Sequence, residues 1–261
     1  MSNITVSTLQ QRKQQAQKVT CLTSYDAALA RLVDAAGVDV ILVGDSLGMV
    51  VQGQMSTVPV TLEQMVYHTQ CVARGVKHAF IVADLPFASY QTTAQAMQSA
   101  AALMQAGAHM VKLEGNFSAT ISALVGQGIP VCGHVGLLPQ SVHRLGGYRV
   151  QGKGDAAQQI IEDALSIEHA GAQLIVFECI PVGLARDLTA RLNVPTIGIG
   201  AGVDCDGQVL VIHDMLGITP APRARFVKDF LQGADSISQA IEHFVEQVKQ
   251  QQFPDDSHGY E

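Results

Sequence analysis

The sequence predicts a single (β/α)8 barrel, an α/β fold in which eight parallel strands alternate with helices. Runs of apolar, mostly β-branched residues recur eight times, and segments with helical spacing of apolar residues separate them. In five turns a glycine lies after a helix and before an apolar run, as helix C-caps require. The length of 261 residues fits one barrel, for which about 250 residues is typical. An open doubly wound sheet is the alternative fold.

The elements follow in order along the chain. Ser7 and Thr8 suit the N-cap of a short polar helix that runs to about Gln17. The predicted strands are 19–23, 38–43, 79–83, 110–113, 130–133, 174–177, 196–198 and 209–212. The predicted helices are 25–36, 62–74, 93–106, 118–126, 156–170, 183–192, a segment around Phe226, and 236–250. Residues 1–261 therefore form one domain, and we expect the tail at about 251–261 to be flexible.

Composition limits the partners that this chain can have. The formal net charge of −7 argues against nucleic acid and against an anionic membrane, so we expect a small-molecule partner. Only 15% of the residues are charged, which is below the usual quarter and favours a homo-oligomer.

The cysteines and the N-terminal segment indicate a compartment. Five cysteines, without CxxC spacing, predict reduced core residues. The segment 1–18 has no apolar core of a signal peptide, and no apolar run approaches the length of a membrane span. We expect a cytoplasmic protein.

Carboxylates follow four of the predicted strands. The strand 38–43 is a solid apolar run, typical of a strand buried on both faces, and it ends at Gly44 and Asp45. The ends of the next strands carry Asp84, Glu114 and Glu178. In a barrel these ends meet at one face, where active sites of this fold lie. Because clustered carboxylates repel one another, a divalent cation would stabilise them.

Oxygen ligands without a thiolate favour Mg²⁺, and we predict Asp45, Asp84 and Glu114 as its ligands. Calcium or manganese would suit the same ligands. The alternative for each residue is a helix N-cap, since acidic residues often cap the helix that follows a strand.

Lys112, Glu178 and His134 are further candidates. Lys112 lies two positions before Glu114 and therefore on the same face of its strand. It is a counter-ion for a substrate carboxylate, a Schiff-base nucleophile, or a partner of Glu114. Glu178 has an apolar setting that raises its pKa toward the range of a general base, or it holds a water molecule or His134. His134 is either a core residue or a ligand.

The glycine-rich stretch 147–154 departs from the P-loop pattern, because Gly154 stands where that pattern needs a hydroxyl. We interpret it as part of a mobile loop over the site.

Taken together, the motifs resemble the ketopantoate hydroxymethyltransferase family. The matching segments span about 20–217 in order, and they include VGDSLGMVVQG at 43–53, ADLPF at 83–87, VKLEG at 111–115, CGHVGLLPQ at 132–140, GGYRVQGKG at 146–154 and FECIP at 177–181. The departures are small: Ser24 stands where alanine is usual, and Leu138 where threonine is common.

The resemblance implies a barrel of the phosphoenolpyruvate/pyruvate type, a Mg²⁺ ion, and a homo-oligomer of ten subunits. It also implies hydroxymethyl transfer from 5,10-methylenetetrahydrofolate to 3-methyl-2-oxobutanoate in pantothenate biosynthesis, giving 2-dehydropantoate. On the family's pattern, Asp45, Asp84 and Glu114 match the metal ligands, and Asp45, Ser46, Asp84 and Lys112 match the oxo-acid contacts. Glu178 matches the proposed proton acceptor.

Two other functions remain open from the sequence. One is a Schiff-base or metal-dependent aldolase or lyase of another 2-oxo acid. The other is a non-catalytic oxo-acid or metal-binding regulator built on a barrel, because fold alone does not determine function.

Overall fold

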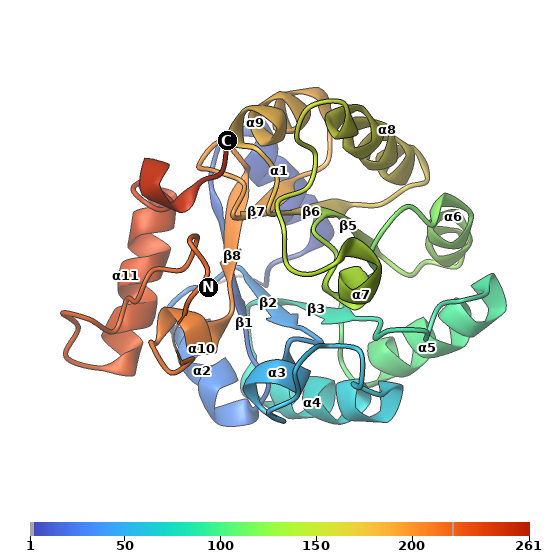
Figure 1. Ribbon diagram of the computed structural model, residues 1–261. Coiled ribbons are helices and arrows are strands. Elements are labelled where there is room, and N and C mark those ends of the chain that lie inside the picture. Colours follow the sequence, from blue (N-terminus) through green and yellow to red (C-terminus); the bar gives the residue numbers. More distant parts are fainter. Residues whose placement is uncertain (1–2, 221) are drawn as a thin grey trace.

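The computed structural model describes residues 3–220 and 222–261. Its strands pair in parallel in the order β1 to β8, and β8 pairs with β1, so the sheet closes. In Figure 1 the helices form a ring around the strands. The predicted (β/α)8 barrel is confirmed. Residues 1–2 and 221, which the predicted single domain includes, lie outside the described residues.

The elements have the following bounds. The strands are β1 (Val19–Thr23), β2 (Val40–Val43), β3 (Phe80–Asp84), β4 (Met110–Lys112), β5 (Val131–Gly136), β6 (Leu174–Glu178), β7 (Thr196–Ile199) and β8 (Gly207–Leu210). The longer helices are α1 (Val6–Gln14), α2 (Ala27–Ala35), α4 (Leu62–Gly75), α5 (Thr93–Gln105), α6 (Ser118–Gly126), α8 (Ala156–His169), α9 (Val182–Arg191) and α11 (Ile237–Lys249). The short ones are α3 (Leu47–Val50), α7 (Val142–Leu145), α10 (Ile212–Met215) and two 3-10 turns, η1 (Pro139–Ser141) and η2 (Asp256–His258).

Every predicted strand overlaps an observed one, and one predicted helix is wrong. The segment around Phe226 has no helix in the described part of the chain. Phe226 instead packs partly buried against both core clusters and lines the cavity described below. The apolar residues around Phe226 are therefore explained by burial and not by the apolar face of a helix.

The strand β2 shows why its sequence is apolar throughout. Val40 packs into the cluster inside the barrel, whereas Ile41 and Val43 pack into the cluster between the sheet and the helices. Successive side chains of a strand point to opposite faces, and in a covered barrel both faces are buried.

Helix α1 closes the end of the barrel at which the strands begin. Thr5 caps α1 by accepting a hydrogen bond from the backbone N–H of Thr8. Leu9 is only 1% exposed and belongs to the cluster inside the barrel. Arg12 Nη1 lies 2.6 Å from Asp39 Oδ2, one residue before β2. With this end closed, the cavity opens at the other end, where the strands finish.

The tail 251–261 packs against the rest of the chain. Phe253 is 2% exposed, and its ring lies 5.2 Å from the ring of Phe230. The backbone N–H of Val182, at the start of α9, donates to the carbonyl oxygen of Tyr260 at 2.9 Å. The tail thereby reaches the mouth of the barrel, and its flexibility stays a prediction.

Two further observations concern the cysteines and the helices. All five cysteines are free, as expected. Within residues 3–220 and 222–261, none of the helices combines the length and the apolarity that crossing a membrane requires.

Candidate active site

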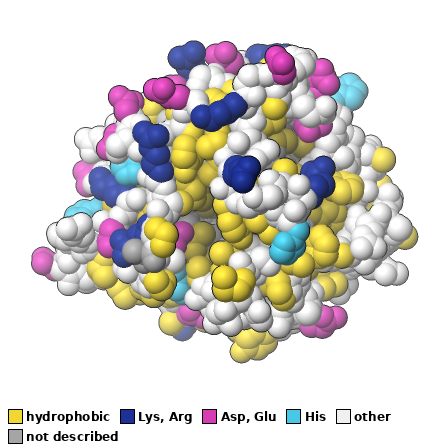
Figure 2. All heavy atoms as spheres, in the orientation of Figure 1, with side chains coloured by type: hydrophobic (Ala, Val, Ile, Leu, Met, Phe, Trp, Pro, Cys, Tyr) yellow, Lys and Arg dark blue, Asp and Glu magenta, His cyan; other side chains and the backbone are white. Residues whose placement is uncertain are grey.

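A cavity of about 560 Å³ lies where the strands end. The face of the molecule in Figure 2 is hollowed near its centre, with hydrophobic side chains around the hollow. The lining contains every residue that the sequence singled out for chemistry: Asp45, Ser46, Asp84, Lys112, Glu114, His134 and Glu178. The fold therefore brings these residues to one place, while the role of each stays a prediction.

Lys112, the last residue of β4, forms a buried ion pair. Its Nζ lies 2.7 Å from Asp84 Oδ1, and the two side chains are 5% and 4% exposed. Asp84 and Lys112 are direct partners in the pairing of β3 with β4. Of the three roles considered for Lys112, the structure does not favour pairing with Glu114, since the ammonium is hydrogen-bonded to Asp84.

Asp45 and Glu114 are held by a residue that the sequence reasoning did not single out. Gln140, in η1, donates from Nε2 to Asp45 Oδ2 at 2.8 Å and from its backbone N–H to Glu114 Oε2 at 3.0 Å. Asp84 Oδ2 in turn accepts the backbone N–H of Asp45 at 3.1 Å. None of these three carboxylates serves as a side-chain helix cap, so the N-cap alternative is not supported.

His134 lies between two carboxylates. Its Nε2 is 3.2 Å from Glu178 Oε2, and its Nδ1 is 3.6 Å from Glu114 Oε1. Burial lowers the pKa of His134 well below its usual value, so the ring is neutral. Each ring nitrogen is buried and faces a carboxylate, but neither makes a well-aligned hydrogen bond among the described residues.

The electrostatics of the site favour a cation. Burial and the charge of Asp84 raise the pKa of Asp45 to about 7, and burial raises the pKa of Glu178 to about 8. Burial and Asp45 raise the pKa of Glu114 as well. Lys112 pairs with Asp84, and the other three carboxylates, Asp45, Glu114 and Glu178, are costly to ionise without more positive charge nearby.

The donor set fits Mg²⁺ held by few protein ligands. Within the described ranges, no three His, Cys, Asp or Glu side chains are grouped closely enough to hold a metal ion as a preformed cage. Mg²⁺ does not require one, because it usually takes one or two carboxylates and keeps water or substrate oxygens. Asp45, Asp84 and Glu114 are the buried oxygen donors that could hold it.

Ser46 lies beside the carboxylates at the start of α3. Its Oγ is 2.9 Å from the hydroxyl of Tyr25, a side chain that is 2% exposed. Gly44 makes room for it, because a Cβ at Gly44 would lie 2.8 Å from Ser46 Oγ. The turn that ends β2 therefore presents both Asp45 and Ser46 to the cavity.

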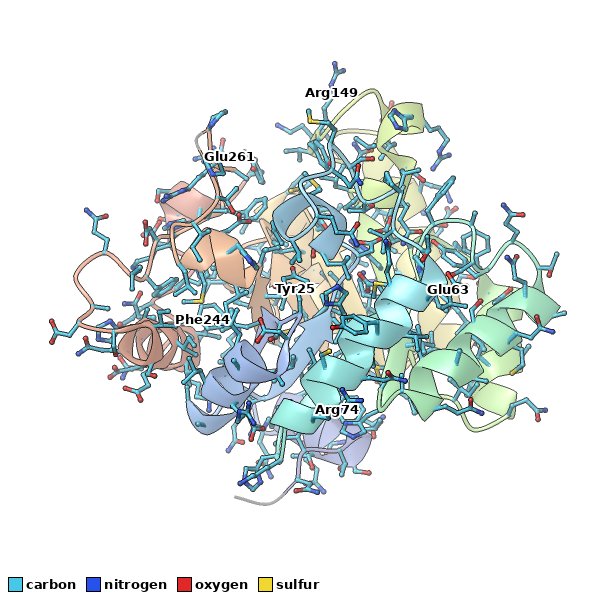
Figure 3. The ribbon with its side chains drawn as sticks, turned by 90° about the horizontal axis from the view of Figure 1, so that it is seen from below. Tyr25, Glu63, Arg74, Arg149, Phe244 and Glu261 are labelled. Atoms are coloured by element: carbon cyan, nitrogen blue, oxygen red, sulfur yellow. The ribbon has the colours of Figure 1, made fainter. Side chains whose placement is uncertain are left out.

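The loop 146–154 and the C-terminal tail form the mouth of the cavity. From the loop 146–154, the Tyr148 hydroxyl donates to the sulfur of Met49 in α3 at 3.4 Å. In the side view of Figure 3, Arg149 and Glu261 lie at the end of the molecule opposite Arg74, which belongs to the last turn of α4. Tyr148, Arg149 and Tyr260 all line the cavity. The loop thus lies across the mouth of the cavity, where the sequence predicts a loop over the site.

Comparison with known proteins decides the family. A family model described as ketopantoate hydroxymethyltransferase matches residues 3–256. The chain belongs to the ketopantoate hydroxymethyltransferase family. A protein of Neisseria meningitidis named 3-methyl-2-oxobutanoate hydroxymethyltransferase is 56% identical over 258 residues, and one of Marinobacter nauticus with the same name is 55% identical over 260 residues. Each match covers 98% of both chains. The resemblance found in the sequence is confirmed, and this member of the family is a hydroxymethyltransferase.

Solved structures show that the family's barrel is shared more widely. A phosphonopyruvate hydrolase complex with oxalate and Mg²⁺ matches with a TM-score of 0.62 at 13% identity, covering 81% of each chain. A 2,3-dimethylmalate lyase, of the PEP mutase/isocitrate lyase superfamily, matches with a TM-score of 0.60 at 16% identity, covering 78% of this chain and 80% of the other. At such low identity these matches concern the fold alone, and they show the same (β/α)8 barrel.

Proposed function

We propose that this hydroxymethyltransferase forms 2-dehydropantoate (ketopantoate) from 3-methyl-2-oxobutanoate, with 5,10-methylenetetrahydrofolate as the one-carbon donor. The names of the relatives support the oxo acid and the product. One observation carries the proposal: a buried Lys112–Asp84 pair, further carboxylates and the high-pKa Glu178 line the same cavity. That combination suits removal of a proton next to a ketone.

Lys112 and Ser46 bind the oxo acid in this proposal. The Lys112 ammonium supplies the positive charge that a substrate carboxylate or a developing enolate oxygen needs, and burial strengthens that contact. Ser46 Oγ lies on the cavity wall next to Asp45 and provides a neutral donor. The carboxylates alone would repel an anionic substrate.

Mg²⁺ would be held by Asp45, Asp84 and Glu114, with the oxo acid completing its ligands. When bound, such an ion acts as a Lewis acid that polarises the ketone and stabilises negative charge on its oxygen. The carboxylates of this chain position the ion, and their hydrogen bonds to Gln140, Lys112 and the backbone keep them in place.

Glu178 removes the proton from C3 of the oxo acid. Its side chain is 16% exposed, at the end of β6. A pKa near 8 makes it a stronger base than an ordinary carboxylate, and positioned bases contribute about 10²–10⁴-fold to rate. The carbon that loses the proton then forms a bond to the one-carbon unit of the folate, and the two bonds from that unit to the folate nitrogens break. Water supplies the hydroxyl oxygen of the product. Tetrahydrofolate leaves with two N–H protons, one taken from C3 by way of Glu178 and one from the water.

The cavity has room for both reactants. Its volume of about 560 Å³ is in the range of roughly 300–1,000 Å³ that holds a whole drug-sized ligand. A five-carbon oxo acid fills a small part of that space. The remainder, toward Tyr148 and Tyr260, is open to a larger second reactant.

A direct assay tests the proposal. We expect purified protein with oxo acid, Mg²⁺ and 5,10-methylenetetrahydrofolate to form ketopantoate, detected by mass spectrometry. We expect no product when the folate is omitted, and loss of activity on adding a chelator that Mg²⁺ in excess reverses. Turnover without the folate would point to the aldolase or lyase alternative, and no turnover at all would favour a non-catalytic regulator.

A homo-oligomer in the cytoplasm also belongs to the proposal, with ten subunits suggested by the resemblance. Large apolar side chains on the surface support association: Met55 is 91% exposed, Tyr67 61% and Phe87 48%. Burying such side chains against another subunit is favourable. A monomeric mass in light scattering at micromolar concentration would contradict it.

A further inference from the structure

Gln140 has every polar group of its side chain engaged at the base of the loop that spans the cavity mouth. It is 5% exposed and lies in η1, directly after β5. Its Nε2 donates to Asp45 Oδ2 at 2.8 Å and to the carbonyl oxygen of Leu85 at 2.9 Å. Its backbone N–H donates to Glu114 Oε2 at 3.0 Å. One residue therefore contacts carboxylates that follow two non-adjacent strands, β2 and β4.

Tyr90 completes the hydrogen bonding of this amide. Its hydroxyl donates to Gln140 Oε1, and the Tyr90 side chain is 7% exposed with its ring edge-on to Phe117 at 5.2 Å. An amide carries one acceptor oxygen and one donor nitrogen. Because the Asp45 carboxylate and the Leu85 carbonyl can only accept, the nitrogen must face them, and Oε1 is left to accept from Tyr90. A flipped amide would place its oxygen against the Asp45 carboxylate.

We infer that Gln140 is a positioning residue for the metal and the oxo acid, and that Tyr90 acts through it. This inference rests on the proposed function, which makes Asp45 and Glu114 ligands. By occupying Oδ2 of Asp45 and Oε2 of Glu114, Gln140 sets which oxygen of each carboxylate is turned to the cavity. Partners that hold metal ligands in this way commonly change metal affinity about 10–100-fold when they are removed.

The alternative is that Gln140 only anchors η1 to the barrel. The two roles predict different results, because an anchor affects folding while a positioning residue affects the cation and the substrate. Two substitutions separate them. Gln140→Leu removes the amide and keeps the backbone N–H that Glu114 accepts. Tyr90→Phe removes one hydroxyl and leaves the ring packing intact.

The experiment measures Mg²⁺ affinity by calorimetry without substrate, the Mn²⁺ electron paramagnetic resonance spectrum, and the KM for the oxo acid. We expect Gln140→Leu to weaken Mg²⁺ binding about tenfold or more, to alter the Mn²⁺ spectrum and to raise KM. We expect Tyr90→Phe to weaken binding about threefold to tenfold, the value of one buried hydrogen bond. The double variant should be no weaker than Gln140→Leu alone, because Tyr90 acts through the amide.

Controls keep the outcomes separate. Gln158→Leu on α8, where the side chain is exposed and outside the cavity lining, should leave all three readouts unchanged. Mg²⁺ affinity within twofold of the unaltered protein in a folded Gln140→Leu variant would overturn the inference, and additive losses in the double variant would overturn the role of Tyr90. If Gln140→Leu does not fold, the Mg²⁺ affinity of the Tyr90→Phe variant tests the inference instead.

The results that would refute the proposed function differ from those that would overturn this inference. Mg²⁺ binding that depends on Gln140 in a protein that makes no ketopantoate would refute the proposed reaction and leave the inference standing. Ketopantoate formation by the unaltered protein, together with unchanged Mg²⁺ affinity in Gln140→Leu, would support the proposed reaction and overturn the inference. An unaltered protein that binds no Mg²⁺ would overturn the inference together with the proposed metal site.

Discussion

Replacing Glu178 with glutamine is expected to reduce exchange of the C3 proton of 3-methyl-2-oxobutanoate with solvent by about 10²–10⁴-fold. The amide keeps the shape of the side chain and its place beside His134, but it has no basic oxygen pair to accept the proton. Mg²⁺ and oxo-acid binding should change little, since Glu178 is not among the residues proposed to hold the metal or to bind the carboxylate and ketone of the oxo acid. The measurement is loss of the C3 proton signal in deuterated buffer, followed by nuclear magnetic resonance.

The pH dependence of the same exchange gives an independent check. Burial raises the pKa of Glu178 to about 8, and the base must be ionised, so exchange should rise with pH until the group has lost its proton. A bound cation would move this rise below pH 8, since positive charge favours the carboxylate. Glu242→Gln, an exposed change on α11, should behave like the unaltered protein. Full exchange in Glu178→Gln would remove Glu178 from the role of base.

Replacing Lys112 with methionine should have the largest combined effect on stability and activity. The change leaves Asp84, which is 4% exposed, buried without its cation, and breaking a buried pair in this way costs about 3–5 kcal/mol. It also removes the positive charge proposed to bind the oxo acid. We expect a lower urea midpoint and a loss of oxo-acid affinity, measured by equilibrium unfolding and calorimetry.

The double variant Lys112→Met/Asp84→Asn separates the two effects. Neutralising Asp84 removes the uncompensated charge, so part of the lost stability should return, whereas oxo-acid binding should not. Borohydride reduction with the oxo acid present should leave Lys112 of the unaltered protein unlabelled, because its ammonium is held by Asp84 at 2.7 Å and an imine needs a neutral amine. A covalent adduct on Lys112 would instead support the Schiff-base alternative.

Local sequence was sufficient to predict the eight strands and the carboxylates that follow four of them. The apolar run 38–43 predicted a strand buried on both faces, and the structure places Val40 inside the barrel and Ile41 outside it. Because parallel strands all finish at the same end of a barrel, Asp45, Asp84 and Glu178 had to meet once the strands were recognised. The same reasoning was wrong around Phe226, whose burial comes from distant contacts.

The partners of these residues were beyond the reach of periodicity. Lys112 was considered as a partner of Glu114 on its own strand, but its ion pair is with Asp84 on the neighbouring strand. Gln140 has no local signal of its role, because Asp45, to which its side chain donates, lies 95 positions away. Tyr260 belongs to a tail whose contacts with α9 leave no local signal.

The sequence by itself determined the eight alternating strand and helix units, the end at which chemistry takes place, and the residue types gathered there, since these follow from the alternation of side chains and from where each apolar run stops. Pairing of β8 with β1, seen only in the structure, closes the sheet and rules out the open alternative. Only the tertiary structure decided which charge pairs with which, which oxygen of Asp45 and Glu114 is left for a ligand, and which segments close the mouth. Hydrogen bonds and ion pairs depend on distances of about 3 Å between side chains remote in sequence, and those distances are set by how the helices and loops pack around the sheet.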